Sequence, residues 1–115
     1  MDIALDVMGG DNAPHAPVQG AIKAVKNSRF DLKLILIGDE LRIKKELGGF
    51  KSESISVLHA SENITSSDQA SKVIKTKPDS SMVKGIRLIK EKKAGAFISA
   101  GNTGAQMATS LLTLG

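Results

Sequence analysis

Four short runs of apolar residues divide the chain, and each run is continuous rather than alternating with polar positions. They occupy residues 3–7, 32–37, 55–58 and 96–99. A continuous apolar run of this length, bounded by turn residues, is typical of a strand that is covered on both faces of its sheet. The pattern therefore predicts four strands in a sheet with two buried faces.

The segments between these runs carry the periodicity of amphipathic helices. The two clearest apolar stripes are Val18, Ala21, Ile22 and Val25 in the first and Met82, Ile86 and Ile89 in the second. A short charged helix is expected over residues 41–47 and a last helix from about 105 to 114. Strands that alternate with helices pair in parallel through right-handed crossovers. The chain thus predicts an α/β fold, an open and mostly parallel sheet with helices on both faces.

Residues 63–81 interrupt this alternation, because they are rich in Ser and Lys and are broken by Pro78. We expect an irregular excursion with a short helix there. No linker or repeat divides residues 1–115, so they form a single α/β domain. Because the apolar ending "LLTLG" is followed by no strand and a four-strand sheet leaves an edge open, we expect an incomplete sheet. This would be the amino-terminal part of a longer catalytic domain.

Composition narrows the classes of function. Apolar residues make up 41% of the 115 and charged residues 24%, as in an ordinary soluble domain. The 16 Lys and Arg exceed the 12 Asp and Glu, which indicates either a solvated basic surface or a docking face for an acidic partner. With three Phe and no Trp or Tyr, stacking platforms are scarce and nucleic acid is not an expected partner.

Residue usage also limits cofactors and location. The chain has no Cys, which removes disulfides, thiolate metal sites and a cysteine nucleophile. His15 and His59 lie at no metal-ligand spacing, so no metal is predicted. The beginning "MDIALDVMGG" does not resemble a signal peptide, and no apolar run approaches the roughly 20 residues of a membrane span. A cytoplasmic location is expected.

Polar and glycine-rich segments follow all four predicted strands. These segments are "MGGDNAP", "GDE", "HASE" and "SAGNTG". Parallel strands end at the same edge of their sheet, and ligands of open α/β folds bind beyond those ends. The segments at the opposite edge have the composition of ordinary solvated connections. The sequence therefore predicts a binding site where the four strand ends meet.

The segment "SAGNTGA" after the last strand is the sharpest of these signals. Gly101 and Gly104 permit close approach of a ligand, while Asn102 and Thr103 are good helix caps. The unpaired N–H groups of the following helix could hold an anion. The alternative is a plain turn from strand to helix. The spacing matches neither a Walker loop nor a dinucleotide fingerprint, so no cofactor is predicted.

The segment "VMGGDNAP" after the first strand has two interpretations. In one, the N–H groups of Gly9 and Gly10 face a ligand that Asp11 or Asn12 orients. In the other, the glycines form a turn whose neighbours cap a helix that begins after Pro17. Asp6 lies inside a strand that should be buried, where an unpaired carboxylate is unfavourable. It either pairs with a neighbour or serves the site.

Several other polar residues have both a structural and a functional interpretation. His15 and His59 are candidate acids or bases, because histidine titrates near neutral pH, or they are structural or solvated. Asp39 is expected to cap a helix. Ser80 or Ser81 should cap the helix that follows, whose N-terminus could also receive phosphate.

Taken together, "DVMGGDNAP", "IGDE", "VLHASE", "DSSM" and "ISAGNTGA" resemble the amino-terminal third of the phosphate acyltransferases of bacterial phospholipid synthesis, the PlsX family. The resemblance spans essentially all 115 residues in matching order. It implies a fold like that of isocitrate dehydrogenase and phosphate acetyltransferase. It also implies transfer of a fatty acyl group from acyl carrier protein to inorganic phosphate, a homodimer, and peripheral association with membrane.

With the resemblance, the candidate site residues can be named. The catalytic candidates are Asn102, Asp11 and His59, and the substrate-binding candidates are Gly9, Gly10, Ser81, Lys75, Ser99, Gly101, Thr103 and Gly104. The family usually has an arginine where Lys75 lies, and lysine keeps the charge but lacks the planar fork that grips phosphate. Two alternatives stay open: a truncated, non-catalytic fragment, and a phosphate- or nucleotide-binding module of the same architecture.

Overall fold

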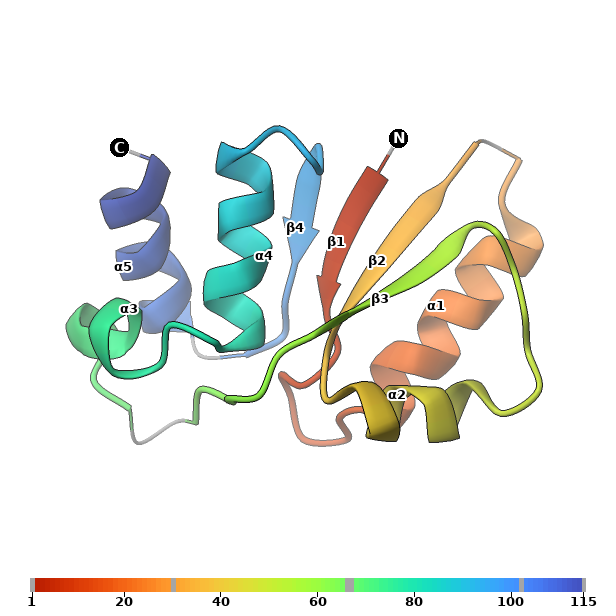
Figure 1. Cartoon of the computed structure of the whole chain (residues 1–115), viewed down its shortest axis with the longest axis horizontal. Coiled ribbons are helices and arrows are strands. Elements are labelled where there is room, and N and C mark those ends of the chain that lie inside the picture. The colour runs from red at the N-terminus through yellow and green to blue at the C-terminus, as the bar shows by residue number, and fades with distance from the viewer. Residues whose placement is uncertain (1, 30, 66–67, 102, 115) are drawn as a thin grey trace.

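The computed structural model describes residues 2–29, 31–65, 68–101 and 103–114 (Figure 1). Along the chain the elements are β1 (Asp2–Asp6), α1 (His15–Asn27), β2 (Lys33–Gly38), α2 (Glu40–Leu47), β3 (Ile55–His59), the 3-10 turn η1 (Ala70–Lys72), α3 (Val73–Thr76), α4 (Ser81–Lys90), β4 (Ala96–Ile98) and α5 (Thr103–Leu114). The four strands form one parallel sheet in the order β3-β2-β1-β4. The predicted strands, the short helix in the excursion and the α/β fold class are confirmed.

Helices cover both faces of the sheet, as predicted. Leu34 and Leu36 of β2 pack in one core cluster with residues of α1 and α2. The alternate residues Ile35 and Ile37 pack in a second cluster, which includes Leu88 and Ile89 of α4. This division follows from the pleat, because successive side chains of a strand point to opposite faces. The helix α5 packs against α4 and η1, on the side of α4 away from β4 (Figure 1).

The ends of the helices confirm some of the predicted caps and correct others. The Asp39 carboxylate accepts hydrogen bonds from the N–H groups of Leu41 (3.0 Å) and Arg42 (3.3 Å) at the start of α2. The Ser80 hydroxyl accepts from the Val83 N–H at 3.2 Å and so caps α4. The expectation that α1 starts after Pro17 was wrong, because α1 begins at His15 without a side-chain cap. Proline is tolerated there because first-turn N–H groups have no partner within the helix.

Two helical glycines lead to opposite predictions. A Cβ added to Gly85 in α4 would overlap the Phe97 ring of β4, whereas a Cβ on Gly20 in α1 would meet nothing within 4 Å. Alanine is intrinsically the better helix former. We expect Gly85→Ala to lower the free energy of unfolding by about 1–3 kcal/mol through overpacking, and Gly20→Ala to raise it by about 0.5–1 kcal/mol. Urea unfolding of both variants measures this; equal stabilisation by both would contradict the packing argument.

Candidate functional site

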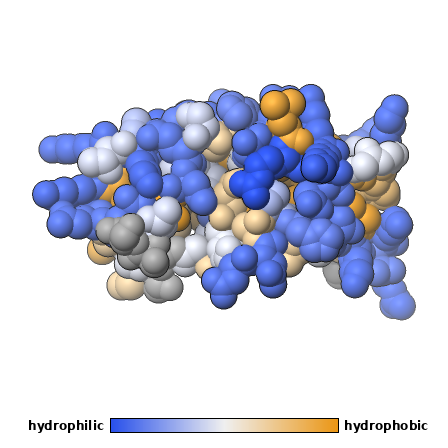
Figure 2. All heavy atoms as spheres, turned by 90° about the horizontal axis from the view of Figure 1, so that it is seen from below, coloured by the Kyte–Doolittle hydropathy of each residue, from blue (hydrophilic) through white to orange (hydrophobic). Residues whose placement is uncertain are grey.

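The carboxyl ends of all four strands lie at one edge of the sheet, the lower edge in Figure 1. Figure 2 looks onto this edge and shows a mostly hydrophilic face with a paler area near its centre. The fold therefore brings the four predicted segments together at this edge of the sheet, which we call the rim. Their contacts fall into two groups, one around Asp6 and one around Asp79.

Asp6, at the end of β1, is a buried carboxylate with 4% of its surface exposed. One oxygen accepts hydrogen bonds from the Ser81 hydroxyl at 2.6 Å and from the Met8 N–H at 2.9 Å. The other accepts from the Ser99 hydroxyl at 2.7 Å. Hydrogen bonds of this kind compensate a buried charge for its loss of water. Asp6 therefore links the ends of β1 and β4 to the first turn of α4.

The loops that follow β1 and β4 lie in backbone contact. A Cβ placed on Gly9 would be 2.7 Å from the Gly101 nitrogen and 3.1 Å from an Asp6 carboxylate oxygen. The Gly101 N–H donates to the Ser99 hydroxyl at 3.0 Å. Gly10 has φ = +92°, which favours glycine. The first glycine is thus needed for contact between the two loops, and the second for the turn.

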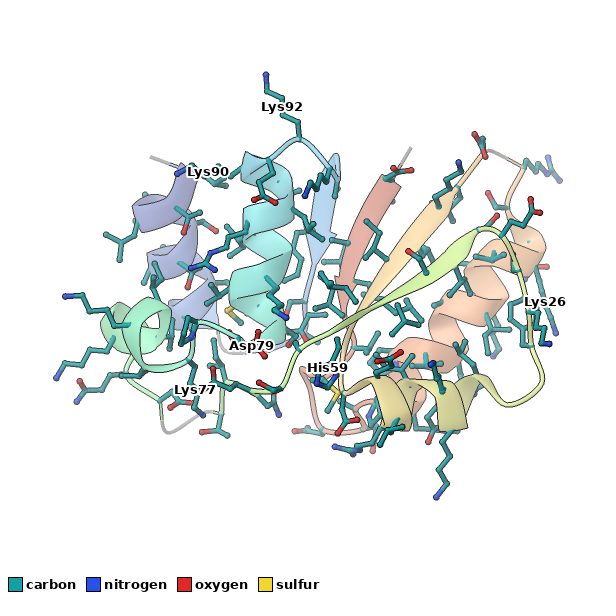
Figure 3. The ribbon with its side chains drawn as sticks, in the orientation of Figure 1. Lys26, His59, Lys77, Asp79, Lys90 and Lys92 are labelled. Carbon is teal, nitrogen blue, oxygen red and sulfur yellow. The ribbon has the colours of Figure 1, made fainter. Side chains whose placement is uncertain are left out.

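A second group of contacts joins the end of β3 to the beginning of α4. Lys84 donates to the backbone oxygen of His59 at 2.6 Å and forms an ion pair with Asp79 at 2.7 Å. Asp79 also accepts hydrogen bonds from the hydroxyl and the N–H of Ser61. The Nδ1 atom of His59 accepts from the Glu40 N–H at 3.1 Å. In a neutral ring this hydrogen bond leaves the proton on Nε2. His59 and Asp79 lie near one another at the same edge (Figure 3).

The environment of Asp79 stabilises its ionised form. The hydrogen bond from Lys84 is the main cause, and the two hydrogen bonds from Ser61 add to it. Together they hold the pKa of the Asp79 carboxyl well below its usual range.

This shift predicts a pH dependence of stability. Because the pKa is lower in the folded state, Asp79 stabilises the fold above the unfolded value of about 3.9, and that contribution is lost as the pH falls further. We expect Asp79→Asn to be less stable than the wild type at pH 7 by an amount that stays constant to about pH 5. Below about pH 4 the difference should shrink. Urea unfolding between pH 7 and pH 2 measures it. An identical profile for Asp79→Asn and the control Glu53→Gln, on an exposed loop residue, would contradict this role.

The predicted site residues are only partly brought together. Gly9, Gly10, Ser81, Ser99 and Gly101 lie around the Asp6 carboxylate or in the loops beside it. The Ser81 hydroxyl is 2.6 Å from Asp6, and Ser81 itself is 1% exposed. Asp11 is exposed in the turn after Gly10, and Gly104 is exposed in the first turn of α5. Asn102 and the side chain of Thr103 lie outside the described residues.

Two candidates occupy different surroundings. Lys75 lies on α3 and lines a separate cavity with residues of α4 and α5. His15 is 2.7 Å from the Glu46 carboxylate, at the start of α1. The structural interpretation of His15 is thereby supported. Lys75 is not among the residues that contact Asp6 or Asp79 in the described structure.

Sequence reasoning did not identify Lys84 and Ser61 as parts of the site. Lys84 is a polar residue between Met82 and Ile86 of the predicted apolar stripe. A usable signal was its position near the start of a helix whose first residues lie at the rim. Ser61 lies within the "HASE" segment, but its link to Asp79 depends on how residues 63–78 return to the sheet.

The residues that the structure describes contain no cluster of three or more His, Cys, Asp or Glu side chains arranged to hold a metal ion. None of the helices traced in them combines the length and apolar character that a membrane crossing needs.

Comparison with known proteins supplies an independent line of observation. A family described as fatty acid synthesis protein matches residues 1–115. Over 117 aligned positions the chain is 50% identical to the phosphate acyltransferase of Alkaliphilus oremlandii, 44% to that of Chlorobaculum parvum and 47% to that of Halothermothrix orenii. Each alignment covers 100% of this chain and 34% or 35% of the relative. The chain thus spans about a third of the length of these relatives. On these matches, the chain belongs to the fatty acid synthesis protein family, whose members similar to it include phosphate acyltransferases.

Proposed function

We propose that this chain forms the phosphate-binding rim of an acyltransferase. The enzyme would move a fatty acyl group from acyl carrier protein to inorganic phosphate, giving acyl phosphate for phospholipid synthesis. Its similarity to phosphate acyltransferases supports the reaction class. The observation that carries the proposal is the backbone contact between the Gly9 and Gly101 loops at the rim where the strands end.

The reaction requires little covalent chemistry from the protein. A phosphate oxygen attacks the thioester carbon, the carbon–sulfur bond breaks, and the proton of hydrogen phosphate ends on the departing sulfur. The protein must hold phosphate in line, stabilise the developing oxyanion and exclude water. No serine or cysteine nucleophile is needed, since phosphate is the nucleophile.

The rim residues can be assigned to these tasks. The Gly10 N–H has no hydrogen-bond partner in the part of the chain that the structure describes, and it lies in an exposed turn. We assign it to phosphate, together with donors from Asn102 and Thr103. Asp11 would orient the ligand. The Nε2–H of His59 would donate a hydrogen bond to the departing sulfur, since the Glu40 N–H already occupies Nδ1.

The role of Asn102 is tested in a full-length acyltransferase that contains this sequence. We expect Asn102→Ala to lower the rate of acyl phosphate formation at least about tenfold, the scale of a lost transition-state donor. The measurement is phosphate-dependent release of free thiol from acyl-acyl carrier protein. The control is Asn27→Ala, which changes an exposed amide at the end of α1. Equal rates for Asn102→Ala and the wild type would reject the assignment.

A second candidate function is phosphate binding without turnover, since the chain spans about a third of its relatives. Thermal unfolding of the 115-residue chain with added phosphate or ATP separates the cases, because a ligand that binds the folded state raises the Tm. A rise with phosphate and no acyl transfer would indicate a binding unit. A rise with ATP alone would indicate a nucleotide module and contradict the proposed acyltransferase.

A homodimer and peripheral association with membrane rest on the resemblance and stay predictions. The cytoplasmic location expected from the sequence also stays a prediction. Sedimentation of the full-length protein with and without lipid vesicles tests the first two.

A further inference from the structure

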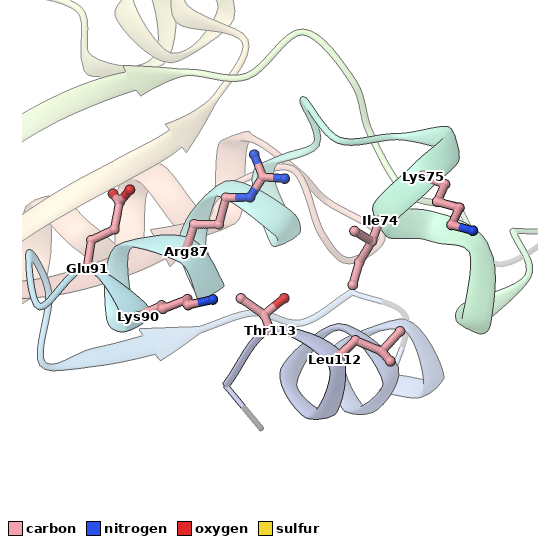
Figure 4. A pocket seen from close by; sticks show the side chains of 7 residues that line it. All are labelled: Ile74, Lys75, Arg87, Lys90, Glu91, Leu112 and Thr113. Carbon is pink, nitrogen blue, oxygen red and sulfur yellow. The ribbon is translucent and has the colours of Figure 1, made fainter.

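A cavity of about 460 Å³ lies away from the rim, between α3, α4 and α5 (Figure 4). Arg87 and Lys90 line it from the last turn of α4, and Lys75 lines it from α3. Ile74 and Leu112 add apolar wall from α3 and α5. Figure 3 places Lys90 and Asp79 at opposite ends of α4, so this cavity and the rim are separate.

The cavity has an excess of positive charge. Within the described residues, Lys75, Arg87 and Lys90 form no ion pair with a carboxylate. The acid in the lining is Glu91, whose carboxylate lies 3.5 Å from the Lys93 ammonium. Three unpaired cations therefore border one concave surface together with a carboxylate that already has a cationic neighbour.

The helix dipole accounts for only part of this arrangement. Cations in the last turn of a helix interact favourably with its free carbonyls, which explains Arg87 and Lys90 in isolation. The dipole of α4 does not explain why Lys75, which lies on the four-residue helix α3, borders the same cavity. The dipole also does not explain why the apolar side chains of Ile74 and Leu112 lie beside the cations, because a lysine in solvent needs no apolar neighbour.

We propose that this cavity binds a phosphate monoester with a small apolar organic part. Its volume lies within the range of small-molecule sites. A guanidinium binds two phosphate oxygens at once, and ammonium groups add point charges. In Figure 4 the Lys90 side chain points toward Thr113, whose hydroxyl is a further donor, and Ile74 and Leu112 border the space for the organic part. The site is independent of the proposed acyl transfer.

The experiment uses the ¹⁵N-labelled 115-residue chain and n-butyl phosphate as the probe. We expect saturable amide shifts concentrated at Ile74, Lys75, Arg87, Lys90 and Thr113. Binding should weaken at high salt, since exposed charges are screened. Inorganic phosphate should bind more weakly there than n-butyl phosphate, and n-butanol should produce no shifts. Arg87→Gln and Lys90→Gln should each raise the Kd at least about fivefold, on the scale of a lost charge-assisted hydrogen bond.

The matched control is Lys23→Gln, which removes the same charge from an exposed position on α1. It should leave the Kd unchanged. Amide shifts at exposed lysines throughout the chain would overturn the proposal. An equal rise of the Kd in Lys23→Gln and Arg87→Gln would also overturn it. So would shifts confined to the loops of Gly9 and Gly101. Shifts confined to those loops would contradict the site between α3, α4 and α5 but not the proposed phosphate site at the rim, so the experiment tests the two proposals separately.

Discussion

Replacing Asp6 by alanine is expected to lower the free energy of unfolding by about 3 kcal/mol. The substitution leaves the hydroxyls of Ser81 and Ser99 and the N–H of Met8 without their acceptor. A buried donor without a partner costs about 1–3 kcal/mol, and hydrogen bonds to charged groups lie toward the upper end. Relief from burying the carboxylate offsets part of the loss, which is why the three contributions do not simply add.

Two further variants sharpen this test. Asp6→Asn keeps one acceptor oxygen but presents an NH₂ group to the remaining donors, so we expect an intermediate loss of about 1–2 kcal/mol. Asp2→Ala removes an exposed carboxylate from the same strand and should change stability by less than about 0.5 kcal/mol. Urea unfolding at pH 7 gives all three values. If Asp6→Ala were no more destabilising than Asp2→Ala, Asp6 would not hold the rim together.

Asp6 also shows why the site was only partly predictable. A carboxylate inside an apolar run signals a buried charge that needs partners, and the sequence indicates that much. Its partners, however, lie 75 and 93 residues further along the chain. Which of the neighbouring serines would reach it depends on where α4 begins: Ser80 became the cap, and Ser81 turned toward Asp6.

The fold was more predictable than the site because its signals are local. Each strand is a continuous apolar run, and each crossover helix carries its own stripe, so element types and parallel pairing follow from short windows. The contacts of Lys75 and Lys84 follow instead from the path of residues 63–80. That segment has no periodicity. Lys75, within it, lines the cavity between α3, α4 and α5, whereas Lys84, in the helix that follows it, lies beside Asp79.

Replacing Gly9 by alanine is expected to lower the free energy of unfolding by about 2–3 kcal/mol, even without any ligand. The added Cβ would lie 2.7 Å from the Gly101 nitrogen and 2.9 Å from its Cα. Because both are backbone atoms, the clash cannot be relieved by rotating a side chain, and overpacking of this kind costs about 1–3 kcal/mol. The loops after β1 and β4 must separate, and the hydrogen bonds of Ser99 to Asp6 and Gly101 should weaken with them.

The control is Gly49→Ala, since a Cβ there meets nothing within 4 Å. We expect it to leave stability unchanged or raise it by up to about 1 kcal/mol. Urea unfolding with and without phosphate separates the two roles that a paired glycine can have. A loss of stability in the absence of phosphate means that Gly9 is required for contact between the loops, as the distances indicate. Unchanged stability combined with lost phosphate binding would mean instead that the missing side chain makes room for the ligand itself.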